Sequence, residues 1–272
     1  MAMIDQSDVL KRNNVTVKGN GSQPIVFAHG YGCDQLMWRF VYPAFLDDYK
    51  VILFDHVGSG NSDESYYDIQ KYNSLQGYAD DILEICHALD LENVILVGHS
   101  VSSMISLLAA NKEPTLFSNI IMIGPSPCYI DKGEYKGGFS QQDIDELLET
   151  LESNYLGWAS TMAPIIMGTP EKPELGEELT NSFCRTNPEI AKHFAKVTFL
   201  SDNRRDLNKL KIPTLIIQCV EDAIAPLTVA EYVNHNITSS TLELIDATGH
   251  CPNLSAPEET ISAIKNYLEK KD

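Results

Sequence analysis

Short apolar runs rich in β-branched residues recur along the chain, and segments with helical spacing separate several of them. The runs do not alternate with polar residues, and they lie at 25–28, 51–54, 94–97, 119–123, 214–219 and 242–245. Strands of this kind are covered on both faces, which is typical of a parallel sheet. From Leu75 to Leu89, apolar residues fall three and four positions apart, as on one face of a helix. The alternation predicts a doubly wound α/β fold, with a mostly parallel twisted sheet and helices on both faces.

Signals at both ends of the chain extend this pattern. Apolar residues at 104–108 have helical spacing, and a last stripe at 261–268 lies between a proline and two lysines that suit the ends of a helix. Near the start, the segment 9–18 leads through the Gly-Asn-Gly turn at 19–21 into the run at 25–28. This arrangement predicts a β-hairpin.

Residues 128–206 interrupt the alternation of strand and helix. They carry helical patterns, for example at 144–151, with no convincing strand between them, and they are rich in aromatic residues and methionine. We therefore expect a core domain made of residues 1–127 and 207–272, with 128–206 as a helical lid insertion. A single buried aromatic residue is ordinarily core packing, whereas the group as a whole is suited to line a ligand cavity over the sheet.

Charge and hydropathy limit the classes of partner. The chain has 272 residues, of which 43% are hydrophobic, and its 20 basic and 38 acidic residues give a net charge of −18. A chain this acidic repels a phosphate backbone, so we expect no nucleic-acid partner. The first 14 residues hold no apolar run of signal-peptide length, and no run reaches the roughly 18 residues of a membrane span. We expect a cytoplasmic protein that does not span a membrane.

The six cysteines are far apart and form no CxxC pair, so neither a zinc site nor a dithiol redox motif is indicated. The segment 55–63, which reads DHVGSGNSD, lacks the lysine and the spacing of a phosphate-binding loop. We interpret it as a tight surface connection near the edge of the sheet rather than a nucleotide site. The sequence therefore predicts no metal and no cofactor.

The strongest chemical motif follows the apolar run at 94–97. There the chain reads Gly98-His99-Ser100-Val101-Ser102, and an amphipathic helical segment comes next. Strand, G-x-S-x-small turn and helix form the nucleophile elbow, in which the backbone of the serine is strained and its neighbours two residues away must be small. Gly98 satisfies this, and Ser102 stands where glycine is commoner. Ser100 is the predicted nucleophile.

Two partners follow in the order that this motif requires. Asp222 comes after the run at 214–219 and begins a D-x-x-x-P sequence, and His250 comes after the run at 242–245. Glu221 is a neighbouring alternative to Asp222, and a loop or capping role is the alternative function of the aspartate. Both residues follow strand ends, where open α/β sheets place their sites. We predict that His250 activates Ser100 and that Asp222 orients His250.

Other histidines are weaker candidates for the base. Only His250 follows the last strand, whereas His29 and His99 flank the predicted site and are interpreted as structural hydrogen-bonding residues. An acyl-transfer reaction also needs donors for its oxyanion. We assign them to the backbone amides of Val101, at the start of a helix, and of Tyr31, in the loop HGYG after the run at 25–28.

Taken together, HGYG, DHVGSGNSD, GHSVS, GPSPCY, GHCP and the D-x-x-x-P loop resemble the α/β-hydrolase superfamily over nearly the whole chain. Within it, GHSVS and GPSPCY resemble the RsbQ-like subgroup of bacterial stress-response hydrolases, which is related to the plant strigolactone and karrikin receptor hydrolases. The resemblance implies a helical lid over a hydrophobic pocket. The pocket residues that it implies are Tyr31, Phe139, Trp158 and Phe199.

The resemblance also implies a signalling role, with a PAS-domain PP2C-type phosphatase of the RsbP kind as partner and a general stress sigma factor downstream. Two hypotheses follow. The chain is an esterase or lactonase for a small hydrophobic substrate, or it is a ligand-binding signalling protein in which turnover is slow or incidental; a general carboxylesterase with no signalling role is a further alternative. Carbon–carbon bond hydrolases and cofactor-free haloperoxidases share the triad, so they stay open. An aspartate nucleophile is excluded by Ser100.

Overall fold

The computed structural model describes residues 6–270, and its centre is a sheet of seven strands in the order β1-β3-β2-β4-β5-β6-β7. The strands are β1 (Thr16–Lys18), β2 (Gln23–Ala28), β3 (Tyr49–Leu53), β4 (Val94–His99), β5 (Phe117–Ile123), β6 (Thr214–Glu221) and β7 (Ser240–Thr248). Every neighbouring pair is parallel except β1 and β3. The predicted parallel α/β sheet is confirmed.

The predicted hairpin at the start of the sheet is wrong. β1 pairs antiparallel with β3, with Val17 opposite Ile52, and not with β2. β1 cannot pair with β2, because both edges of β2 are already paired, one with β3 and the other with β4. The turn after β1 therefore carries the chain past β3, and the Asn20 amide donates to the Leu46 carbonyl at 3.0 Å.

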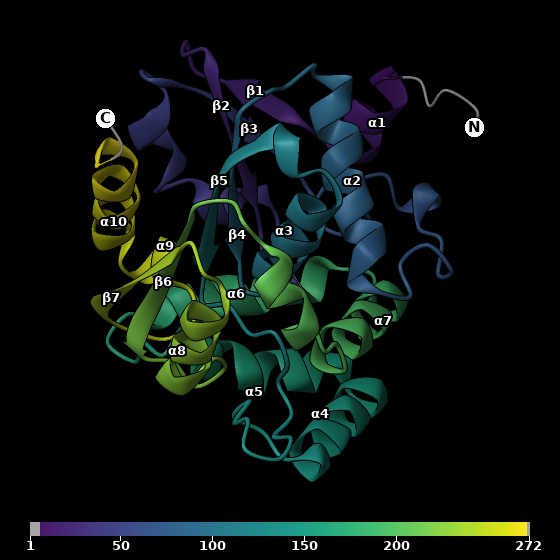
Figure 1. Ribbon diagram of the computed structural model, residues 1–272. Helices are drawn as coiled ribbons and strands as arrows, with labels where there is room; N and C mark the ends of the chain where they lie inside the picture. The colour runs from purple at the N-terminus through teal and green to yellow at the C-terminus, as the bar shows by residue number, and fades with distance from the viewer. Residues whose placement is uncertain (1–5, 271–272) are drawn as a thin grey trace.

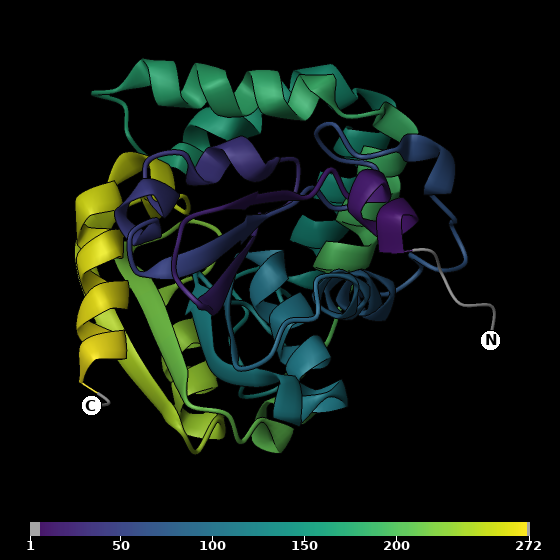
Figure 2. The ribbon, with the colours of Figure 1, turned by 90° about the horizontal axis from the view of Figure 1, so that it is seen from above.

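Helices cover both faces of the sheet (Figures 1 and 2). One hydrophobic cluster joins α1 (Gln6–Arg12), α2 (Leu75–Ala88), α3 (Val101–Lys112) and α8 (Leu227–Asn236) to one face. The other includes residues of α9 (Pro252–Ser255) and α10 (Pro257–Glu269). Alternate residues of each strand supply the two clusters: Ile25 and Phe27 belong to the second, and Val26 and Ala28 to the first. This explains the continuous apolar runs of the sequence.

Between β5 and β6 the chain forms four helices that gather at one end of the sheet (Figure 1). They are α4 (Gln141–Ser153), α5 (Tyr155–Met167), α6 (Pro173–Arg185) and α7 (Pro188–Phe199). All four lie within 128–206, and we call them the helical insertion. The short 3₁₀ helices are η1 (Gln35–Trp38), η2 (Tyr42–Phe45), η3 (Glu64–Tyr66), η4 (Pro114–Leu116) and η5 (Arg204–Lys209). None of the helices between residues 6 and 270 has the length and apolar character that crossing a membrane requires.

The segment 55–63 is a surface connection only in part, because Gly60 and Asn61 are exposed and residues 55–59 are buried. Asp55 and His56 are fully buried at its start. The Asp55 carboxylate accepts the Gln35 amide at 2.8 Å and the Asn61 amide at 2.9 Å, so it fixes two loops at the carboxyl end of β3. A buried carboxylate needs such partners, and they anchor the start of the segment beneath the surface while Gly60 and Asn61 stay exposed.

Candidate active site

The structure brings Ser100, Asp222 and His250 together at the carboxyl ends of β4, β6 and β7. His250 Nε2 lies 2.7 Å from Ser100 Oγ, and His250 Nδ1 lies 2.7 Å from Asp222 Oδ2. The three strands point the same way, so residues that follow each of them meet at one edge of the sheet. All three side chains are buried. The spacing is that of a nucleophile, a base and an orienting carboxylate.

The backbone at Ser100 adopts the strained conformation expected of a nucleophile elbow. Its φ of 56° and ψ of −122° lie where residues with a side chain are rarely found. Gly98 makes the turn possible, because a Cβ there would lie 2.3 Å from the Ser102 carbonyl oxygen and 2.6 Å from Ser106 Oγ. The turn thus aims the Ser100 hydroxyl at His250 rather than into the core.

Hydrogen bonds and the neighbouring His250 favour the ionised form of Asp222. Its Oδ1 accepts the Ile224 amide at 2.8 Å and the Ala225 amide at 3.0 Å, while Oδ2 faces His250. Burial acts to raise the pKa of Asp222, but the charge of His250 and these hydrogen bonds outweigh it, so the pKa is lower than usual. Glu221, the alternative from the sequence, is exposed. An ionised Asp222 accepts the Nδ1 proton of His250, which leaves Nε2 free to accept the Ser100 proton.

His99 and His29 make structural hydrogen bonds, as expected. His99 Nε2 donates to the His250 carbonyl oxygen at 2.6 Å, and His29 Nδ1 donates to the Gly30 carbonyl at 2.8 Å. Burial and the neighbouring His250 lower the pKa of His99 to about 3, so its ring is neutral at neutral pH. His99 therefore supports the backbone at His250 and is not a second base.

The loop with Tyr31 and the start of α3 lie beside Ser100. A Cβ built on Gly30 would lie 3.4 Å from Ser100 Cβ, so this loop packs directly against the nucleophile. Across residues 6–270, neither the Tyr31 amide nor the Val101 amide donates a hydrogen bond. Two unused backbone donors next to a serine hydroxyl are what an oxyanion hole requires.

A small cavity of about 40 Å³ opens onto Ser100 and His250. Of the four predicted pocket residues, Tyr31, Trp158 and Phe199 line it. Tyr129 and Phe183, which belong to the aromatic group of residues 128–206, also line it, and sequence reasoning missed other lining residues that include Cys33, Ile166, Leu179, Thr198, Ile224 and Cys251. Most of these side chains are apolar, so the cavity suits a hydrophobic group next to the reactive serine.

Phe139, the fourth predicted pocket residue, does not line this cavity. Its amide donates to the Tyr129 carbonyl at 3.2 Å, and its carbonyl accepts the Asp131 amide at 2.8 Å, so the segment folds back on itself before the insertion. Tyr129 takes the position at the cavity instead. Burial raises the pKa of Tyr129 to about 12, against the opposing effect of a hydrogen bond with Ser100. Tyr129 belongs to the loop that follows β5 at the carboxyl end of that strand, and an aromatic residue in such a loop was the signal that could have found it.

The two cysteines at the cavity are not alternative nucleophiles. Cys33 and Cys251 both line it and both are buried. Burial raises the pKa of each thiol well above its usual value, so the reactive thiolate is not formed at neutral pH. In the part of the chain that the structure describes, no group of three or more histidine, cysteine, aspartate or glutamate side chains is placed to hold a metal ion.

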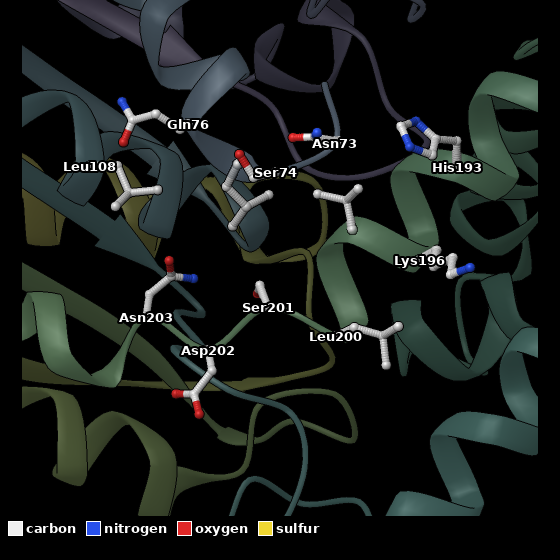
Figure 3. A pocket seen from close by; sticks show the side chains of 12 residues that line it. Asn73, Ser74, Gln76, Leu108, His193, Lys196, Leu200, Ser201, Asp202 and Asn203 are labelled. Atoms are coloured by element: carbon white, nitrogen blue, oxygen red, sulfur yellow. The ribbon is translucent and has the colours of Figure 1, made fainter. Parts of the chain in front are cut away.

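A larger pocket of about 530 Å³ lies elsewhere, between the start of α2 and the end of α7 (Figure 3). Polar side chains such as Asn73, Gln76 and Asn203 surround it. Its carboxylate, Asp202, is paired with Arg204 at 2.7 Å and with Lys132 at 3.1 Å. The triad residues are not part of its lining. Size alone would favour this pocket, but Ser100 and His250 line the smaller cavity.

Comparison with known proteins agrees with this geometry. Residues 25–263 match the model of a family described as the alpha/beta hydrolase family. The chain belongs to the alpha/beta hydrolase family. It is an enzyme of this fold, and the match spans strands β3 to β7, most of β2 and the helical insertion.

Curated relatives of this hydrolase cover nearly its whole length. It is 36% identical to a karrikin insensitive 2 receptor of Petunia hybrida, over 96% of this chain and 97% of the relative. It is 34% identical to a strigolactone esterase of Arabidopsis thaliana, over 98% of this chain and 100% of the relative. Among solved structures, a hydrolase from Oleispira antarctica matches with a TM-score of 0.96 and 43% identity, covering 98% of both chains. The hydrolase is therefore similar to plant receptors and esterases and to a bacterial hydrolase.

Proposed function

We propose that this hydrolase cleaves small hydrophobic esters or lactones, with Ser100 as nucleophile, His250 as base and Asp222 as the residue that orients the base. The observation that carries the proposal is the hydrogen-bonded chain from Ser100 Oγ through His250 to Asp222, with 2.7 Å at each step. A serine hydroxyl is a weak nucleophile at neutral pH until such a base removes its proton.

The reaction follows from these positions. As Ser100 Oγ attacks the ester carbonyl carbon, His250 Nε2 takes its proton and Asp222 stabilises the imidazolium. The negative charge on the carbonyl oxygen is bound by the amides of Tyr31 and Val101. His250 then gives its proton to the departing alkoxide, and a water molecule, activated by His250 in the same way, releases the acyl group from Ser100.

The substrate class follows from the walls of the cavity. Aromatic and aliphatic side chains of the helical insertion, including Trp158, Phe183 and Leu179, face the triad. Such walls favour an apolar acyl or alcohol group and disfavour a charged one. The names of the relatives, a strigolactone esterase and a karrikin insensitive 2 receptor, support a small-molecule ligand.

Hydrolysis of p-nitrophenyl esters tests this function. The wild-type enzyme should cleave p-nitrophenyl butyrate, and Ser100→Ala should reduce kcat by at least about 10³-fold while the protein stays folded, because the nucleophile is lost. A folded Ser100→Ala variant that retains most of the wild-type turnover would show that another group performs the reaction.

We also propose an RsbQ-like regulatory role, in which this hydrolase activates a PAS-domain PP2C-type phosphatase of a stress-response pathway. The motifs GHSVS and GPSPCY and the receptor names among the relatives support it. A cytoplasmic location is part of this proposal and suits six unpaired cysteines, of which five are buried.

A pull-down with a purified phosphatase of this kind tests the regulatory role. Binding together with increased phosphatase activity would support it. Comparing wild type with Ser100→Ala then separates the two signalling hypotheses. If the variant activates the phosphatase fully, ligand binding is sufficient; if it does not, turnover is required. No binding and no activation by either protein would contradict the regulatory role and leave the esterase proposal intact.

A further inference from the structure

Three buried side chains outside the triad form a hydrogen-bonded network behind Ser100. They are His29 at the end of β2, His56 after β3 and Ser102 in the first turn of α3, and all three are fully buried. Their sequence positions are far apart, and the network joins three segments that surround the nucleophile. None of the three takes part in a step of the reaction proposed for Ser100, His250 and Asp222.

The direction of each hydrogen bond can be deduced. Ser102 Oγ donates its single proton to the His29 carbonyl, which can only accept. His56 Nε2, 2.8 Å from Ser102 Oγ, must therefore be the donor of that contact. His29 Nε2 accepts the His56 amide at 3.0 Å, so its ring proton is on Nδ1 and is donated to the Gly30 carbonyl. Burial lowers the pKa of both rings, which favours their neutral forms, and the hydrogen bonds then fix the tautomer of each.

The Gly30 carbonyl is where this network reaches the reaction. It accepts His29 Nδ1 at 2.8 Å and the Cys33 amide at 3.3 Å. The Gly30–Tyr31 peptide is trans, so its carbonyl and the Tyr31 amide point in opposite directions. Holding the carbonyl therefore sets the direction of the Tyr31 amide, the first predicted oxyanion donor.

The second donor is tied to the same network. Ser102 follows Val101 directly in α3, and its hydroxyl links that helix to the His29 carbonyl. The two amides come from different segments of the chain, and the bonds of Ser102 fix those segments relative to each other. A glycine at this position, which is commoner in the elbow motif, would lack this link.

We propose that Ser102, His56 and His29 are positioning residues that hold the Tyr31 and Val101 amides in register as one oxyanion hole. The inference rests on the proposed function, because it concerns the oxyanion formed when Ser100 attacks. The network acts on the transition state more than on the bound substrate, since the donors are required only when negative charge develops.

Kinetics of Ser102→Ala on p-nitrophenyl butyrate test this inference, with Ser106→Ala as the matched control. Ser106 is also a fully buried serine of α3, and its hydroxyl has no hydrogen-bond partner among residues 6–270. We expect Ser102→Ala to lower kcat about tenfold or more, with KM changed less than threefold. Ser106→Ala should stay within twofold of wild type in both.

An alkyl trifluoromethyl ketone supplies a readout that a merely structural role would not change. Ser100 adds to its carbonyl and forms a tetrahedral oxyanion, so its affinity reports the oxyanion hole. Across the variants, the loss of affinity for this ketone should match the loss in kcat. A loss of kcat with undiminished affinity for the ketone would overturn the inference, as would a Ser102→Ala variant that behaves like Ser106→Ala.

The His56 pair decides the question if Ser102→Ala does not fold. His56→Phe keeps an aromatic ring beside Phe54 and Tyr78 but removes the donor to Ser102, whereas His56→Gln keeps an N–H at similar reach. We expect His56→Phe to lose kcat and ketone affinity together and His56→Gln to recover most of both. Equal effects of the two variants would contradict the inference. Turnover that persists in Ser100→Ala would instead contradict the proposed function.

Discussion

The strand ends and the helical insertion form opposite sides of one cavity, and they are held in different ways. On the strand side, His250 contacts Ser100 and Asp222 through hydrogen bonds of 2.7 Å, which depend on direction as well as distance. On the insertion side, the rings of Trp158 and Phe183 pack against Tyr31, with centroids 6.1 and 5.8 Å apart, and fewer hydrogen bonds of this kind reach the triad, such as that from the His250 amide to the Ile166 carbonyl at 2.8 Å. Apolar contacts are non-directional and tolerate sliding. The sheet therefore fixes the relative positions of Ser100, His250 and Asp222, and the insertion supplies apolar walls of the cavity.

The cavity between the strand ends and the insertion is small. Its volume of about 40 Å³ has room for only about three water molecules. Sites for small-molecule ligands commonly measure about 300–1,000 Å³. The cavity is therefore smaller than such sites, whereas the hydrogen bonds among Ser100, His250 and Asp222 are already formed.

The largest expected effect tests the strand side. Asp222→Asn should lower kcat about 10⁴-fold, because an amide cannot hold His250 in the required tautomer or stabilise its charge. Glu221→Gln is the matched control; its side chain is exposed and it should keep kcat within twofold. Stopped-flow or steady-state hydrolysis of p-nitrophenyl butyrate measures both. Equal activity of the two variants would contradict the claim that Asp222 orients His250.

Phe183→Ala tests the insertion side. Phe183 is 2% exposed and contacts both Tyr31 and Trp158, so its truncation should lower the free energy of unfolding by about 3–5 kcal/mol. It should also raise kcat/KM for an octanoyl ester relative to an acetyl ester, since the cavity gains volume. Urea denaturation and a series of p-nitrophenyl esters measure the two effects. An unchanged preference among acyl chain lengths would contradict the claim that Phe183 limits the size of the acyl group.

Acid should destabilise the sheet side of the molecule. His29, His56 and His99 are buried with lowered pKa values, so below about pH 6.5 the unfolded chain binds protons that the folded chain does not. Stability is then lost as the pH falls from about 6.5 toward the lower folded values, by about 1.4 kcal/mol per pH unit for each histidine. Urea denaturation between pH 7.5 and 4.5 measures the slope, and His99→Gln should make it shallower. A pH-independent free energy of unfolding would contradict the buried, neutral histidines.

The smallest effect concerns a polar link between the two sides. Arg39 contacts both carboxylate oxygens of Glu178 in α6 at 2.6 Å, but the pair is partly exposed. Glu178→Gln should therefore change the free energy of unfolding by less than about 1 kcal/mol, and less still at high salt. Thermal unfolding at low and high sodium chloride measures it. A loss above about 2 kcal/mol would mean that polar contacts also hold the insertion.

The sequence predicted the strand side far better than the insertion side. Ser100, Asp222 and His250 could be found because each follows an apolar run, and parallel strands bring their carboxyl ends together. The hairpin prediction failed because β1 pairs with the strand whose edge is free. That strand is β3, and the order of strands in the sheet cannot be read from the local sequence. Phe139 was misplaced because the backbone pairing of residues 129–139 sets the direction of its side chain.

The network behind the elbow shows the same limit. From the sequence, Ser102 could be interpreted only as a small residue of the elbow. Its partner His56 follows a different strand, so no local pattern reveals their contact. The contact depends on β3 lying beside β2 and on the burial of residues 55–59, neither of which local patterns predict. Local patterns therefore identify reactive residues at strand ends, while the contacts that position them require the folded chain.

Labelling with a fluorophosphonate probe, followed by peptide mapping, tests the central claim most directly. The probe reacts with a serine that a base has activated, and it forms a covalent phosphonyl adduct. We expect one adduct per folded chain, on Ser100, and its loss in His250→Gln. An adduct on another residue, or none on the folded wild-type protein, would contradict the claim that His250 activates Ser100.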